Sequence, residues 1–156
     1  MKNIDRCIKR LKSYAQSLEE KNNLLLQRLT EYGGFVASVR FSNAIYNGDN
    51  DVAVTVEEDN GIYRIIANGK AVAFIEFGSG AKYGGTYPKN NVAGISTEAG
   101  SWSTVYGKGH YADKNGWWYG HGQHSFGNPP AMALYDASKE MRMRLLEIAK
   151  EVYGGK

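Results

Sequence analysis

The sequence predicts an α+β fold in a single domain that spans residues 1–156. Apolar residues recur with a helical period near both ends of the chain, they alternate with a period of two between residues 35 and 78, and the glycine- and aromatic-rich stretch 79–127 follows neither period. The expected order is a long N-terminal helix, a four-stranded antiparallel meander, a long aromatic loop, and a C-terminal helix packed on the sheet. A chain of 156 residues fits one ordinary domain with one core.

The N-terminal segment is predicted to be an amphipathic helix over residues 2–32, with Gly33 and Gly34 as its stop. At 1.5 Å per residue it would be about 45 Å long, which exceeds the roughly 30 Å diameter of a small domain. We therefore expect part of it to project or to pack on a neighbouring subunit; the alternative is a helix laid across its own sheet with a frayed start. Its apolar positions, separated by alternating steps of four and three with Asn22 in the polar slot, are Ile4, Ile8, Leu11, Ala15, Leu18, Leu25, Leu29 and Tyr32.

The middle of the chain is predicted to form an antiparallel meander. The alternation of apolar and polar residues favours strands, and three Asn-Gly pairs supply residues that accept the positive φ of tight hairpin turns. The last strand is apolar on both faces, so we expect it to be covered on both sides or to lie at the centre of the sheet. The predicted strands are 35–46, 51–58, 62–67 and 70–78, with turns at Asn47-Gly48, Asn60-Gly61 and Asn68-Gly69.

The C-terminal segment is predicted to be a second helix. Asn128 is expected to cap it, with proline in its first turn, and Gly154 and Gly155 are expected to end it. Charged residues of both signs cover the remaining face. The apolar seam consists of Leu134, Met141, Leu145, Ile148 and Val152.

The charge and cysteine content exclude few functions. The net charge is +3, and the single cysteine, Cys7, rules out an intrachain disulfide framework and favours a cytoplasmic origin. No apolar run is long enough for a membrane helix or a general secretory signal, so we expect no membrane association. A basic cluster near the N-terminus is more simply a solvated helix face than a DNA-facing surface. It comprises Lys2, Arg6, Lys9, Arg10 and Lys12.

The loop 79–127 is the segment whose composition a hydrophobic core does not explain. Loops of this length are uncommon in compact domains, and aromatic residues argue against simple disorder, so we expect it to order against a partner with aromatic anchors. The anchors predicted for a subunit or partner interface are Trp102, Tyr106, Trp117, Trp118 and Tyr119, together with Glu76, Phe77 and Gly78 at the end of the last strand.

Chemistry in this loop has weak support. His121 and His124 have the spacing of metal ligands and His110 lies upstream, but no Cys pair, His-Glu-x2-His helix or accompanying carboxylate motif supports a zinc site. No serine lies in a nucleophile elbow, and the glycine run from Gly78 lacks the lysine and the helix of a phosphate loop. We therefore expect no catalytic residues, no metal and no cofactor.

Glu76 is a polar residue in an apolar segment, and two interpretations stay open. Its carboxylate contacts a neighbouring subunit or the loop, or it points to solvent by simple alternation.

Two short motifs resemble the small tail-component family of long-tailed bacteriophages, which comprises tail-completion and head-to-tail joining proteins. They are Ala73-Phe74-Ile75-Glu76-Phe77-Gly78-Ser79 and Asn128-Pro129-Pro130-Ala131-Met132-Ala133-Leu134. The resemblance implies a virion structural protein of the neck or tail, assembled in the host cytoplasm. It also implies a homo-oligomeric ring, expected to be a hexamer, that contacts neighbouring neck and tail proteins. DNA would pass through its lumen without sequence readout, and the family supplies no catalytic residues.

Two other functions remain as alternatives to assembly. One is a metal-dependent hydrolase that uses His110, His121 and His124. The other is a glycan- or peptide-binding module in which Trp102, Trp117 and Trp118 act as stacking platforms. Neither alternative accounts for the length of the first helix.

Overall fold

The computed structural model describes residues 2–79, 115–119 and 122–154, and it confirms an α+β fold with a long N-terminal helix, an antiparallel strand pair and a C-terminal helix. The helices and strands are α1 (Lys2–Ser42), β1 (Ala53–Asp59), β2 (Ile62–Asn68), α2 (Val72–Phe77), β3 (Trp117–Tyr119), β4 (Gln123–Ser125) and α4 (Ala133–Tyr153).

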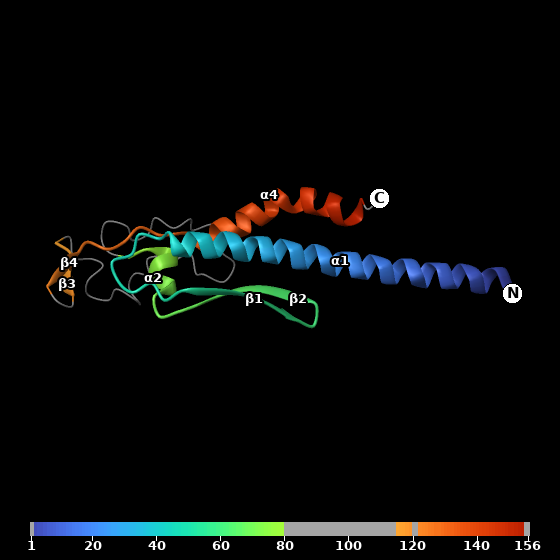
Figure 1. Cartoon of the computed structure of the whole chain (residues 1–156), viewed down its shortest axis with the longest axis horizontal. Helices are drawn as coiled ribbons and strands as arrows, with labels where there is room; N and C mark the ends of the chain where they lie inside the picture. Colours follow the sequence, from blue (N-terminus) through green and yellow to red (C-terminus); the bar gives the residue numbers. More distant parts are fainter. Residues whose placement is uncertain (1, 80–114, 120–121, 155–156) are drawn as a thin grey trace.

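The molecule is elongated, with α1 as its central rod (Figure 1). Helix α4 lies along one side of the C-terminal half of α1, and the β1–β2 hairpin lies along another side. The short helix α2 sits beside the C-terminal end of α1, whereas the N-terminal end of α1 and the β3–β4 hairpin lie at opposite ends of the molecule.

Helix α1 continues through Gly33 and Gly34 to Ser42, so the prediction that these glycines end the helix is wrong, as is the predicted strand 35–46. Both glycines are buried. A Cβ on Gly33 would lie 2.7 Å from Ile65 Cδ1 and nearer still to Met141 Sδ, and a Cβ on Gly34 would lie 2.7 Å from Val56 Cγ2. The glycines therefore serve close packing of the hairpin and of α4 on α1.

The segment after the glycines fits a helix as well as a strand. Ala37 and Phe41 lie four residues apart and are both buried, whereas Phe35 and Val39 are exposed. Residues at positions i and i+4 lie on the same face of a helix. A segment whose apolar residues alternate as in a strand can therefore also form a helix that turns Ala37 and Phe41 toward the core.

The β1–β2 hairpin confirms the two central strands of the predicted meander. Its antiparallel register closes at Asp59 and Ile62, across a two-residue turn in which Asn60 and Gly61 have φ of 52° and 77°. Positive φ at both central residues is the geometry that Asn-Gly favours in tight hairpins. Among the described residues, no third strand pairs with this sheet.

The predicted strand 70–78 is wrong, because residues 72–77 form the short helix α2. Ala71 and Ile75 pack with Phe41 of α1 and Ala133 of α4 in a buried cluster. An apolar run covered on all sides suits a buried helix as well as a buried strand, so its composition alone does not separate them.

The side chain of Asp51 fixes the turn that enters α2. One carboxylate oxygen accepts a hydrogen bond from the backbone N–H of Lys70 at 2.9 Å, and the other accepts from Ala71 at 3.3 Å. These bonds lower the pKa of Asp51, the bond from Lys70 contributing most.

Helix α4 confirms the predicted C-terminal helix and its end before Gly154, but two details are wrong. It begins at Ala133, after Met132 in a left-handed conformation, and not next to Asn128. It also packs along α1 and not on the sheet: Ile148 and Val152 contact Leu29, with Leu25 and Met141 beside them. Ion pairs Arg28–Glu151 at 3.1 Å and Arg40–Asp136 at 3.0 Å lie at the two ends of this helix contact.

We predict that Gly33→Ala lowers the free energy of unfolding by about 1 kcal/mol. The added methyl group favours the helix by about 1 kcal/mol but overpacks its contacts with Ile65 and Met141 by about 2 kcal/mol. Urea denaturation measures the loss, and in a Met141→Ala background it should shrink by about 0.5 kcal/mol or more. Strictly additive effects of the two substitutions would contradict this packing.

We predict that Asp51→Asn flattens the acid limb of the stability curve. The folded-state pKa of Asp51 lies below its unfolded value of about 3.9, so its contribution to stability is complete above that value and is lost as the pH falls through the folded pKa. Thermal unfolding at a series of pH values compares the two proteins. The wild type should be the more stable at neutral pH, and the difference should shrink below about pH 4. A constant difference would contradict the role of the ionised carboxylate.

Candidate subunit interface

The two motifs that were singled out in the sequence contact each other. Ala131 N donates to the Ile75 carbonyl at 2.8 Å, and Met132 N donates to the Glu76 carbonyl at 3.2 Å. Ser79 and Asn128 exchange backbone hydrogen bonds of 3.0 and 3.2 Å. Residues 75–79 and 128–132, which are about fifty positions apart in the chain, thus form one junction between α2 and α4.

Glu76 is the centre of this junction. Its side chain is 1% exposed, and its two carboxylate oxygens accept hydrogen bonds from Leu134 N at 3.1 Å and Tyr135 N at 3.2 Å. These N–H groups belong to the first turn of α4, where no helical acceptor exists and where a negative charge is favoured. The carboxylate of one helix thus caps another helix of the same chain.

This placement changes the interpretation of Glu76. The expectation that its carboxylate points to solvent is wrong, and at 1% exposure it presents no surface to another subunit. The signal in the sequence was a lone carboxylate inside an apolar run, which a buried cap explains because a buried charge needs partners.

Gly78 and Phe77 complete the junction. Gly78 has φ of 76°, and a Cβ there would lie 2.8 Å from Pro130 N and 2.9 Å from the Asn128 carbonyl oxygen. Glycine is therefore required both for the turn and for the close approach of the second motif. Phe77 is half-buried beside it.

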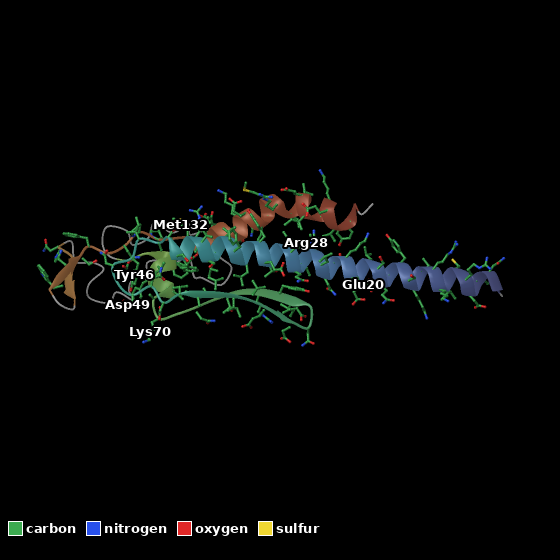
Figure 2. The ribbon with its side chains drawn as sticks, viewed as in Figure 1. Glu20, Arg28, Tyr46, Asp49, Lys70 and Met132 are labelled. Carbon is green, nitrogen blue, oxygen red and sulfur yellow. The ribbon has the colours of Figure 1, made fainter. Side chains whose placement is uncertain are left out.

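The N-terminal half of α1 is a different kind of surface. Tyr153, the last residue of α4, donates a hydrogen bond from its hydroxyl to Asn22 Oδ1. Beyond this level, no other described helix or strand lies beside α1 (Figure 1). In Figure 2, Arg28 lies on the part of α1 beside α4, whereas Glu20 lies near the end of that contact. Residues 2–21 are called the α1 overhang.

The α1 overhang carries an uncovered apolar stripe. The heptad-like repeat that packs on α4 through Leu25 and Leu29 runs on toward the N-terminus. There it has no cover among the described residues: Leu11 is 62% exposed. The expectation that part of the helix projects is confirmed. The exposed members of the stripe are Ile4, Ile8, Leu11 and Leu18.

The predicted basic cluster lies on the same overhang. Arg6, Lys9, Arg10 and Lys12 are exposed, and the side chain of Lys2 lies outside the described part. Residues 2–12 contain five basic residues and one acidic residue, Asp5, which gives this stretch a net charge of +4.

The described part of the aromatic loop forms a small hairpin, β3–β4. Trp118 is 71% exposed, and its ring meets His124 edge to face at 4.7 Å between centroids; His124 meets Phe126 in the same way, also at 4.7 Å. Trp117 and Tyr119 lie in β3, but their side chains are outside the described part, as are Trp102, Tyr106, His110 and His121.

The sequence analysis missed a second exposed apolar surface, on α4. Leu146 is 74% exposed, and Met143, three residues before it, is exposed as well. Leu145, which was assigned to the apolar seam of this helix, is also exposed. The spacing of three between Met143 and Leu146 was the available signal.

The described residues contain no group of side chains suited to a metal ion. Within residues 2–79, 115–119 and 122–154, no three His, Cys, Asp or Glu side chains are grouped so that they could hold a metal ion. None of the helices described there combines the length and apolar character needed to cross a bilayer. The chain matches no protein-family model, no curated protein and no solved structure with which it was compared.

We predict that Glu76→Gln lowers the free energy of unfolding by about 2 kcal/mol, because the amide accepts only one of the two N–H groups and leaves the other without its charged acceptor. Urea denaturation monitored by circular dichroism measures the loss. The control is Glu19→Gln on the exposed α1 overhang, which should change stability by less than about 0.5 kcal/mol. Equal effects of the two substitutions would argue against the cap.

Proposed function

We propose that the protein is a virion structural subunit of a phage neck or tail, of the tail-completion or head-to-tail joining kind, which acts by assembly and not by catalysis. The observation that carries the proposal is the α1 overhang, whose apolar stripe is exposed over residues 4–18. Water-exposed apolar stripes of this length are typical of interaction surfaces. An assembly subunit needs such a surface, whereas neither alternative function does.

The α2–α4 junction supports the same proposal. The two motifs that resemble the phage tail-component family bond to each other through backbone atoms and through Glu76. Their residue types therefore have a structural reason: Glu76 caps α4, and Gly78 permits close approach. Motifs that stabilise the contact between α2 and α4 are consistent with a family that has no catalytic residues.

The distribution of surfaces supports a ring. The α1 overhang and the aromatic β3–β4 hairpin lie at opposite ends of the molecule (Figure 1). A closed ring needs head-to-tail contacts between two different surfaces of each subunit, and the α1 overhang supplies one of them. In such a ring, which we propose to be a hexamer, DNA would pass through the lumen without sequence readout.

We predict that the protein lies at the neck or tail end of phage particles. Electron microscopy of particles that carry a C-terminal tag on this chain, decorated with a gold-labelled antibody, measures its position. Gold at the neck or tail end is the expected result, and particles without the tag are the control. Intact particles that never bind gold would contradict the proposal. A glycan-binding function of Trp118 would then be the next to test, by tryptophan fluorescence.

A further inference from the structure

We propose that the α1 overhang of one subunit docks on the outer end of the β1–β2 hairpin of a second copy of this chain. These would be the two surfaces through which copies of the protein bind each other. The contact does not depend on the neck or tail function, so each of the two proposals can be wrong while the other is right.

The two surfaces have opposite charge. Residues 2–12 of the overhang have a net charge of +4, from five basic residues and one acidic residue. Residues 57–64 of the hairpin contain Glu57, Glu58 and Asp59 against Arg64, which gives −2. All four of these hairpin residues are exposed. Complementary charge steers association and selects among possible partners.

Both surfaces also present apolar side chains. Ile8 and Leu11 are exposed on the overhang, and Ile62, at the turn end of the hairpin, is 53% exposed. Val56, opposite Ile65 in the register, is also partly exposed. The contact would thus bury an apolar centre between charged rims, which is the usual anatomy of a protein interface.

The two surfaces of one subunit are too far apart to satisfy each other. The hairpin runs beside the C-terminal half of α1, and its turn stops short of the N-terminal part of the overhang (Figure 1). The overhang of one copy therefore meets the hairpin of another copy and not its own.

Two other described surfaces fit the α1 overhang less well than the hairpin does. A second overhang would bring two stretches of net charge +4 together. The outer face of α4 around Met143 and Leu146 is apolar enough, but residues 139–151 contain four basic and three acidic residues and so have a net charge of +1. Of the three surfaces compared, the hairpin is the one that combines exposed apolar side chains with acidic charge.

Charge reversal on each surface tests the proposal. Sedimentation velocity over a range of concentrations compares the wild type with K9E/R10E on the overhang and with E57K/E58K on the hairpin. Each double variant alone should weaken self-association about tenfold or more, whereas a mixture of the two variants should restore it, because the reversed overhang meets the reversed hairpin. Association should also weaken as salt is raised from about 0.05 M to about 0.5 M.

The matched control is K139E/R142E on α4, which changes charge by the same amount away from both surfaces and should leave association unchanged. Circular dichroism checks that each variant is folded, and Ile8→Glu, which leaves the hairpin intact, should also weaken association.

A monomeric wild type, unaltered association of the charge variants, or a mixture that stays dissociated would overturn the proposal. So would a K9E/R10E variant that loses only binding to a DNA duplex. Gold at the neck together with any of these results would keep the neck function and reject this interface.

Discussion

The architecture depends on the absence of side chains at two successive positions of α1. Gly33 and Gly34 lie where Ile65 and Val56 of the hairpin meet the helix, and Met141 of α4 approaches Gly33 as well. Each glycine costs the helix about 1 kcal/mol relative to alanine. The cost is offset by close packing, because the hairpin and α4 both contact the backbone of α1. A two-stranded hairpin is only marginally stable alone, so its contact with α1 stabilises it.

The second organising contact is polar. Glu76 joins α2 to the first turn of α4, and the backbone bonds of Ile75 and Ser79 to residues 128–132 keep that carboxylate in position. The glycines set how closely the hairpin and α4 approach α1, whereas Glu76 sets where α4 begins. The start of α4 follows a left-handed Met132 and has no side-chain cap of its own. A carboxylate brought from α2 replaces the local cap that Asn128 was expected to provide.

The parts of the fold that local chemistry determines could be predicted from the sequence. The Asn60-Gly61 hairpin and the part of the α4 seam that packs on α1, namely Met141, Ile148 and Val152, follow from turn geometry and periodicity. The helical state of residues 35–42 and 72–77 could not, because Phe41 and Ile75 fit either period and are decided by burial against distant elements. The overhang was foreseeable from helix length, whereas the function of Glu76 as a cap depends on contacts with Leu134 and Tyr135, which sequence spacing does not reveal.

Because α1 is continuous, its length sets the distance between its two ends. One unbroken helix joins the exposed stripe at Ile4 to the packed glycines at Gly33, so the position of the stripe relative to the core is fixed by the number of residues between them. Seven residues correspond to about 10.5 Å of length and nearly a whole number of turns. Relatives whose helix differs by seven residues would keep the stripe on the same face at a different reach, whereas a change of two residues would turn it to the opposite side.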